Sequence, residues 1–463
     1  VDALFCFWGF IKMNILIVGN GFDLSHYLPT KYDHFMVAME AIENWDVSKG
    51  EMNFDDLFSA LYEKEDYFFG YTKAMYKTDE IKISVDQIKD LQEQLKDNVW
   101  YQYFSDHVKE VKTWIDFEQK IEDGLDSVVL CLQQAEKFSL DKNYLKTNID
   151  FEKNSDIEQF FLNRSTCNIL KNLGILISDY YDEEYDSDND RFILHKIYNP
   201  EYQSDDNLKF FINEIFLSIC YGFNKLDNKK VVKFLFSNLE NFIDIFNIYL
   251  RDVVDHLTAK SIFNKTLFDS LSFEKIYSFN YTSTFIKLYE EEQDIDFLHG
   301  KFGKNQNIVL GISEITHEFL QKLKAYGFTK YHQKILKNTN YLFLDDSTNI
   351  FKAIMRGTTV IDTSLKKFNF YIWGHSLDIS DQEYIKDLFS FNLEKDQNVK
   401  IIIFHFDEPA KYELLGNLLH ILGKKKIEQW MKKGWLKFEK NPDIAKINGI
   451  EPVELPKMTA QVS

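Results

Sequence analysis

The sequence is poor in cysteine, and the few cysteines that it has lie far apart. Four occur among 463 residues, and no two of them form a CxxC pair. Four scattered cysteines without a CxxC pair make a disulfide framework or a thiolate metal site improbable, so neither is expected to organise this chain. Sparse cysteine use is typical of a reducing compartment, and we expect a cytoplasmic protein.

Long hydrophobic runs are also missing. No apolar stretch approaches the ~20 residues that span a bilayer. Residues 1–12 are apolar but short, and they lack the basic start and small-residue cleavage site of a signal peptide. Met13 directly precedes the first strand-like run. We therefore interpret residues 1–12 as an upstream or vector-derived segment, with a short membrane-binding tag as the alternative.

Positive charge is in deficit. The chain has 54 basic and 73 acidic residues, which gives a formal net charge of −19. A field of that sign repels nucleic acid unless a basic patch overrides it, and no such patch is interleaved with aromatic residues. Walker A and zincin motifs are absent as well. Nucleic acid, a membrane and a catalytic metal are therefore not expected as partners.

What the sequence does contain is a set of short apolar runs near its two ends. These runs predict buried parallel strands at 15–18, 275–279, 296–298, 308–310, 368–373, 399–406 and 435–438, with helical patterns at 381–391, 410–422 and 427–433. The middle of the chain predicts helices at 84–98, 115–136, 157–181, 207–223 and 229–257, and an acidic loop at 179–190. We interpret the chain as an α/β protein. Its Rossmann-like, mostly parallel sheet is formed by residues 13–36 and 271–463, and a large, mostly helical insertion at 37–270 divides it.

The first run ends in a glycine loop that leads into a helical pattern. Glycines let the backbone approach a ligand, and a helix N-terminus offers free N–H groups to an anion. The dinucleotide fingerprint needs a third glycine, but Leu24 stands in its place. A tight turn with an aspartate as helix cap is the alternative. The candidate ligand-binding residues here are Gly19, Asn20, Gly21, Asp23, Pro29 and Thr30.

Three further polar groups follow predicted strands. Ligands of open α/β sheets bind outside the carboxyl ends of the strands, so these groups are candidates for one shared site. An asparagine there can orient a water or a ribose hydroxyl, and a histidine can act as a general base near neutrality. Turns and helix caps are the alternative for each group. The groups are Asn280-Tyr281-Thr282, His299-Gly300, and Gly374-His375-Ser376 with Asp381.

Ser376 also suggests a different chemistry. The residues around it are close to the nucleophile-elbow pattern G-x-S-x-G, in which the serine attacks an acyl group. His405 or His420 would be its base, and Asp407 lies near His405 in the sequence. Asp378 replaces the second glycine of the pattern, where a side chain would crowd the turn. That departure argues against an acyl hydrolase.

Five separated motifs resemble those of the AbiH family, which is named for phage abortive infection. AbiH-like proteins in turn resemble sirtuin-like NAD-binding domains, whose pattern is matched by the Gly19 to Leu28-Pro29 spacing, by Asn280, by His299-Gly300 and by Gly374 with Ser376. The AbiH motifs are, in chain order, GNGFDLSHYLPTKYDHF from Gly19, WIDFE from Trp114, SFNYTSTF from Ser278, LHG from Leu298 and YIWGHSLDISD from Tyr371.

Two positions depart from the sirtuin-like pattern. Tyr27 replaces the glycine that precedes the Leu-Pro pair, which would narrow or reshape the pocket. Thr282 replaces the aspartate that usually lies two residues after the asparagine. The second departure falls in the catalytic motif and bears directly on the reaction.

The resemblance implies an antiphage effector that binds NAD⁺ and hydrolyses its nicotinamide–ribose bond. Asn280 would position the ribose or a water, His299 would accept a proton, and Gly19–Gly21 would hold the pyrophosphate. A phage or host protein as trigger and a homo-oligomer are expected by analogy. The alternative is a non-catalytic module that senses a nucleotide and engages a protein through its aromatic insertion.

Overall fold

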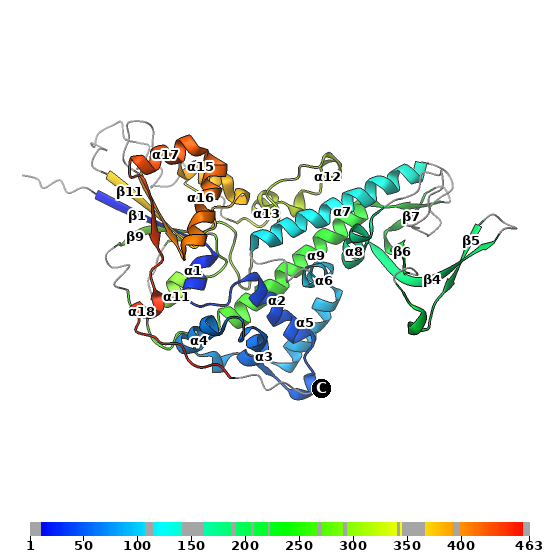
Figure 1. Ribbon diagram of the computed structural model, residues 1–463, viewed down its shortest axis with the longest axis horizontal. Coiled ribbons are helices and arrows are strands. Elements are labelled where there is room, and N and C mark those ends of the chain that lie inside the picture. Colours follow the sequence, from blue (N-terminus) through cyan, green and yellow to red (C-terminus); the bar gives the residue numbers. More distant parts are fainter. Residues whose placement is uncertain are drawn as a thin grey trace, which may run out of the picture.

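The fold is built around a six-stranded parallel sheet (Figure 1). The spatial order of the strands is β10-β9-β1-β11-β12-β13, so numbering them along the chain gives 3-2-1-4-5-6. The strands are β1 (Ile11–Val18), β9 (Phe273–Ser278), β10 (Ile295–Phe297), β11 (Lys366–Trp373), β12 (Val399–His405) and β13 (Leu436–Lys440). The computed structural model describes residues 11–106, 114–140, 162–186, 191–204, 208–220, 223–265, 271–289, 294–339, 343–344, 366–391 and 399–456.

Most of the predicted sheet is confirmed, with two corrections. Strand β1 begins at Ile11, so residues 11 and 12 belong to the sheet, and residues 1–10 lie outside the described part of the chain. The predicted strand at 308–310 is wrong. Gln333 bonds both the N–H and the C=O of Leu310, at 3.0 and 2.8 Å, and thereby replaces the ladder partner that a strand would need.

The sheet has an apolar core on each face because successive strand residues point to opposite sides. On β1, Leu16 and Val18 join the core that faces the middle of the chain. Ile15 and Ile17 join a second core with residues of α15 (Gln382–Leu388), α16 (Glu408–Leu422) and α17 (Lys424–Lys432). Figure 1 shows these three helices above the sheet and the helical middle of the chain on its other side.

The other helices lie mostly in the middle of the chain. Helix α5 begins at a capping box in which Ser84 and Gln87 satisfy each other's backbone N–H, and Asp227 caps α9. The helices are α1 (Asn20–Ser25), α2 (Tyr32–Glu43), α3 (Phe54–Phe58), α4 (Asp66–Met75), α5 (Val85–Asp97), α6 (Val99–Ser105), α7 (Trp114–Leu140), α8 (Arg164–Asn172), α9 (Asn228–Tyr249), α11 (Thr284–Tyr289), α12 (Glu318–Lys322), α13 (Lys330–Leu336) and α18 (Ile444–Ile447).

The middle of the chain is less helical than predicted. The helices expected at 157–181 and 207–223 are wrong except for α8, and residues 157–161 lie outside the described ranges. The predicted acidic loop is a strand as far as Asp186. Aromatic and β-branched residues favour strands, and short apolar runs do not distinguish the two structures. The strands are β2 (Met52–Asn53), β3 (Lys82–Ile83), β4 (Leu176–Asp186), β5 (Arg191–Lys196), β6 (Leu208–Ile212), β7 (Leu217–Cys220) and β8 (Phe223–Leu226).

Aromatic rings fill the core of this middle region. The ring centroids of Phe104 in α6 and Phe117 in α7 are 4.1 Å apart. Phe117 in turn stacks on Phe242 of α9, with 5.4 Å between ring centroids. Phe35 of α2 meets the same Phe242 edge-on at 5.6 Å. The aromatic content therefore packs helices together. Within the described residues, no helix has the length and apolar character needed to cross a bilayer.

Candidate functional site

The register of the sheet brings the predicted groups to one edge. Val18 pairs with both Ser278 and Trp373, and Ser278 also pairs with Phe297. The strands therefore end at the same level. The residues that follow each strand, from Gly19, Asn280, His299 and Gly374 onward, emerge beside one another.

The glycine loop packs directly against Gly374. The N–H of Gly19 donates to the carbonyl of Trp373 at 3.0 Å, and the N–H of Gly21 donates to the carbonyl of Gly374 at 2.9 Å. A Cβ on Gly19 would lie 2.6 Å from the Gly374 oxygen, so this contact requires glycine. Both N–H groups are therefore already hydrogen-bonded within the protein. To bind a phosphate as the sequence predicts, they would first have to break these bonds.

Asp23 lies at the centre of a buried polar group beneath the loop. Thr282 donates its hydroxyl to Asp23 Oδ2 at 2.5 Å, and Thr284 in turn donates to Thr282 at 3.1 Å. Burial raises the pKa of Asp23 to about 6, against the effect of these hydroxyls and of the nearby Asn280 amide. A carboxyl group from α1 thus contacts the threonine that replaces the expected aspartate.

Asn280 carries two polar atoms that are not used. Its side chain is buried, and neither Oδ1 nor Nδ2 makes a well-aligned hydrogen bond with any described residue. Asp23 Oδ1 is buried and unbonded in the same way. Buried polar atoms without a well-aligned partner cost roughly 1–3 kcal/mol each, so these atoms stand out from the rest of the strand ends.

Tyr27 adopts the conformation that explains the glycine of the sirtuin-like pattern. Its φ is 56°, in the left-handed region that glycine adopts without strain. The Tyr27 ring packs on Tyr71 of α4, with 4.6 Å between ring centroids. The ring is thus anchored against α4.

His299 lies in a buried network centred on Asp381. His299 Nε2 is 3.2 Å from Asp381 Oδ1, and His375 Nε2 is 3.5 Å from Asp381 Oδ2. The N–H of Leu377 donates to His375 Nδ1 at 2.9 Å, so the remaining ring proton lies on Nε2 and faces the carboxylate. Burial lowers the pKa of His299 to about 3, which keeps its imidazole neutral.

Lys330 joins this network to the middle of the chain, a connection that sequence analysis missed. Its Nζ lies 2.7 Å from Glu118 Oε1 and 3.5 Å from Asp381 Oδ1. Burial opposes ionisation of Asp381, but Lys330 and His299 outweigh it and hold the pKa well below its usual range. Burial raises the pKa of Glu118 to about 7. Glu118 closes the WIDFE motif, which was the available signal.

Aromatic residues and a second lysine complete the site. The ring of Phe279 meets His299, His375 and Tyr384 in edge-on contacts, at centroid distances of 5.1, 4.1 and 5.1 Å. Lys334, one helical turn after Lys330, donates to the Tyr384 hydroxyl. Neither Lys334 nor Tyr384 was predicted, because each lies on a helix outside the strand-end motifs.

Comparison with protein families identifies the chain. The sequence model described as "Bacteriophage abortive infection AbiH" matches residues 15–405, from the middle of β1 to the end of β12. The protein belongs to the AbiH family. Searches of curated proteins and of solved structures gave no match.

The remaining predicted residues of this AbiH-family chain have backbone or packing roles in the structure. Gly300 has a φ of 86°, and a Cβ there would lie 1.9 Å from the Asn307 carbonyl oxygen. Tyr281 donates its hydroxyl to the Val309 carbonyl at 3.1 Å, and Tyr249 donates to the Pro29 carbonyl at 2.5 Å. Thr30, the residue after Pro29, is buried. Asn20 begins α1.

The residues of an acyl-hydrolase triad are not assembled. Ser376 is exposed, and its only bond among those described is its carbonyl oxygen accepting from Asn417 at 3.0 Å. His405 Nδ1 is instead bonded to the backbone carbonyl of Asp407 at 3.0 Å, and His420 is exposed on α16. The Asp407 side chain caps α16 at the N–H of Ala410. Within the described residues, no hydrogen bond therefore joins Ser376 to His405 or His420.

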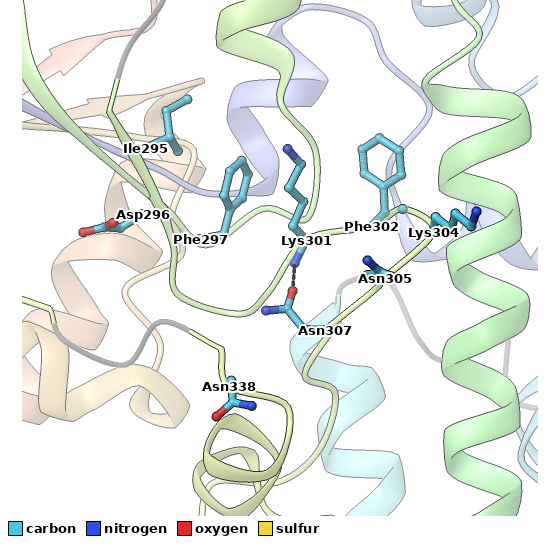
Figure 2. Close-up of a pocket in the computed structure, with 10 residues that line it drawn as sticks. Ile295, Asp296, Phe297, Lys301, Phe302, Lys304, Asn305, Asn307 and Asn338 are labelled. Atoms are coloured by element: carbon cyan, nitrogen blue, oxygen red, sulfur yellow. Dashed lines mark hydrogen bonds between the residues drawn. The ribbon is translucent and has the colours of Figure 1, made fainter.

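A hollow of about 460 Å³ opens beside the strand ends (Figure 2). It lies where the chain passes from β10 through Lys301 to Asn307, and Asn338 after α13 forms part of its wall. None of the predicted site residues lines it. Figure 2 shows Phe297, Lys301 and Phe302 around this space, with Asn307 accepting from the N–H of Lys301 at 2.8 Å.

Within the described residues, one cluster of metal-ligand type combines two residues of the first AbiH motif with Glu65. Ligand atoms of Asp33, His34 and Glu65 lie within 4.8 Å of one another. Two ammonium groups already compensate the carboxylates, because Lys31 Nζ is 2.5 Å from Glu65 and Lys64 Nζ is 3.4 Å from Asp33. An ion-pair network accounts for this cluster without a metal.

Proposed function

We propose that this AbiH-family protein acts in phage abortive infection by binding NAD⁺ and hydrolysing its nicotinamide–ribose bond. The strand order 3-2-1-4-5-6 is that of the doubly wound, Rossmann-like sheets that bind dinucleotides. In such sheets the ligand binds beyond the carboxyl ends, where the strand order reverses, which here is between β1 and β11. The observation that carries the proposal is the buried amide of Asn280, which follows β9 beside β1 and makes no well-aligned hydrogen bond within the described residues.

The side chains offer a consistent route for hydrolysis. Water attacks the anomeric carbon of the ribose, the bond to nicotinamide breaks, and nicotinamide leaves with the bonding electron pair. The Asn280 amide holds the water or a ribose hydroxyl, and the carboxylate of Asp23 stabilises the positive charge that develops on the ribose. Neutral His299 accepts the proton, and Asp381, 3.2 Å away, stabilises the imidazolium that forms.

Nicotinamide release by the purified protein tests the reaction. We expect Asn280→Ala and His299→Ala each to lower the rate at least 100-fold, the scale of a lost proton-transfer or charge-stabilising group. Asn44→Ala, at the exposed end of α2, is the matched control and should retain the rate. The assay is run with and without an extract of phage-infected cells, which supplies an activating partner if one is needed.

Measurements in infected cells separate hydrolysis from nucleotide sensing. The proposal expects NAD⁺ to fall during infection in protected cells, and both the fall and the protection to disappear with Asn280→Ala. Protection that persists in this variant without loss of NAD⁺ contradicts the proposal. Protection that depends on Asn280 while NAD⁺ stays constant would instead identify a non-catalytic sensor.

A further inference from the structure

Lys334 is a buried cation without a carboxylate partner. Its side chain lies on α13 and is only 5% exposed. Within the described residues, no carboxylate oxygen lies within 4.0 Å of its Nζ, and its one hydrogen bond goes to the hydroxyl of Tyr384. Burial lowers the pKa of Lys334 to about 8. A buried ammonium with so little compensation costs free energy in the ligand-free fold.

The neighbouring Lys330, in contrast, has its positive charge compensated by two carboxylates. It lies one helical turn earlier and contacts both Glu118 and Asp381. Asp381 is shared further with His299 and His375. Asp381 and Glu118 therefore contact Lys330 and act on Lys334 only from a greater distance, without an ion pair among the described residues.

Tyr384 provides a second donor at the same place. Lys334 donates to the Tyr384 oxygen, so the hydroxyl proton of Tyr384 is directed away from the ammonium. Burial raises the pKa of Tyr384, which keeps that proton on the oxygen. The ammonium and the phenol together present donors to an anionic oxygen.

We propose that Lys334 and Tyr384 form a binding site for a phosphate group of the nucleotide ligand. The proposal rests on the NAD⁺ function above and places the pyrophosphate on α13. The glycine loop, where the sequence led us to expect it, has its Gly19 and Gly21 N–H groups bonded to the loop after β11. Phosphate supplies the negative charge that the buried ammonium lacks and accepts bonds from both donors.

The hollow in Figure 2 offers a path for the rest of such a ligand. Asn338, which lines the hollow, follows Lys334 by four residues and lies just after the end of α13. Two further lysines, Lys301 and Lys304, belong to its wall. The acidic residue of the wall, Asp296, lies 3.0 Å from Lys275 Nζ, which also contacts Asp294 at 2.6 Å. The electrostatic balance of the hollow thus favours an anion.

The test measures binding and thermal unfolding with sodium pyrophosphate and with ADP-ribose, against sodium chloride and sodium acetate at equal ionic strength. The wild-type protein should bind pyrophosphate and unfold at a higher temperature in its presence. Lys334→Met should weaken this affinity at least 10-fold. Without ligand, the same variant should unfold at or above the wild-type temperature, because methionine removes the buried charge. Tyr384→Phe should weaken binding several-fold. Lys322→Met, exposed on α12, is the control.

Several outcomes would overturn the site. One is a Lys334→Met variant that binds pyrophosphate as tightly as the wild type. If Lys334→Met does not fold, an unchanged affinity in Tyr384→Phe overturns the site instead. Acetate binding as tightly as pyrophosphate would overturn the assignment to phosphate. Nicotinamide release, measured on the same samples, separates the two proposals. If pyrophosphate binding depends on Lys334 but NAD⁺ is not cleaved, the phosphate site stands and the proposed hydrolysis is contradicted. If Lys334→Met cleaves NAD⁺ with an unchanged KM, only the phosphate site is contradicted.

Discussion

Burial controls the protonation of the carboxyl groups at the strand ends, and the direction differs from residue to residue. Asp23 and Glu118 are buried with hydroxyl or single-lysine partners, and burial raises the pKa of each, to about 6 and about 7. Asp381 is equally buried, but Lys330 and His299 keep it ionised. Groups with separated pKa values at one place are typical of catalytic sites, because one can hold a proton while another stays charged.

Asp23→Asn should change how stability depends on pH. The folded-state pKa of Asp23 is about 6 and its ordinary value is 3.8, so the native state holds an extra proton between these values. The wild-type free energy of unfolding therefore falls as the pH rises through this window, by at most about 3 kcal/mol from this group. The variant should lose less stability between pH 4 and pH 7, which urea unfolding across that range measures.

The control for this experiment is Glu413→Gln, a neutralised carboxyl on the exposed face of α16. Its pH profile should follow that of the wild type. A profile of Asp23→Asn that also coincides with the wild type would contradict the raised pKa of the buried Asp23 carboxyl. Because Asp23 stabilises charge in the proposed reaction, the same variant should lose activity even where it gains stability.

The sequence predicted the part of the site that follows the strands. Asn280, His299, Gly374 and Asp381 each come just after a recognisable apolar run, and strand ends converge in a parallel sheet. Glu118, Lys330, Lys334 and Tyr384 lie on helices with no such marker. Their convergence depends on how α7, α13 and α15 pack against the sheet, which one-dimensional periodicity does not contain.

At the scale of elements, the contact between the glycine loop and Gly374 fixes α1 against β11. Gly374 has a φ of 74°, and a Cβ there would lie 2.0 Å from the Phe22 nitrogen. Gly374→Ala should therefore cost about 2–5 kcal/mol of unfolding free energy, from left-handed strain and overpacking. Chemical denaturation measures the loss.

Gly416→Ala is the matched comparison. Gly416 lies inside α16, and a Cβ there would meet nothing within 4 Å. Alanine is the better helix former, so this variant should gain about 0.5–1 kcal/mol. Equal effects of the two substitutions would contradict the close approach between Gly374 and α1.

Secondary structure was predictable where the surroundings agree with the local pattern. Mostly apolar runs at 368–373 and 399–406 form β11 and β12, because residues of both strands join an apolar core on each face of the sheet. The stretch 207–223 contains as many apolar residues but forms β6, β7 and β8 with neighbouring segments. Pairing with an adjacent segment decided its conformation, and composition alone does not reveal that pairing.

At the scale of the molecule, the hairpin β4–β5 extends away from the body (Figure 1). Strand β5 pairs with β4 alone, whereas β4 also pairs with β6 over Leu176–Tyr180. Replacing residues 183–194 with an Asn-Gly turn keeps the pair Asp182–His195 and the β4–β6 ladder. We expect the melting temperature to change by less than about 2 °C, because loops remote from the core contribute little to stability.

Scanning calorimetry measures this change, and a larger drop would show that the arm supports the body. Phage protection by the shortened protein is a separate readout. Intact stability with lost protection would make the arm a contact surface for another protein, in line with the trigger expected from the family resemblance.

The central position of β1 has a consequence for how the protein is made. Its neighbour β11 lies far along the chain, and Asn14 and Asn369, which are hydrogen-bonded across the two strands, are 355 residues apart. At synthesis rates of roughly 5–20 residues per second, more than ~15 s pass between the appearance of the two strands. The carboxyl edge of the sheet cannot be complete until most of the chain has left the ribosome. A growing chain of this protein therefore lacks the complete carboxyl edge for nearly the whole of its translation, and prematurely terminated chains that lack β11 cannot assemble the candidate site.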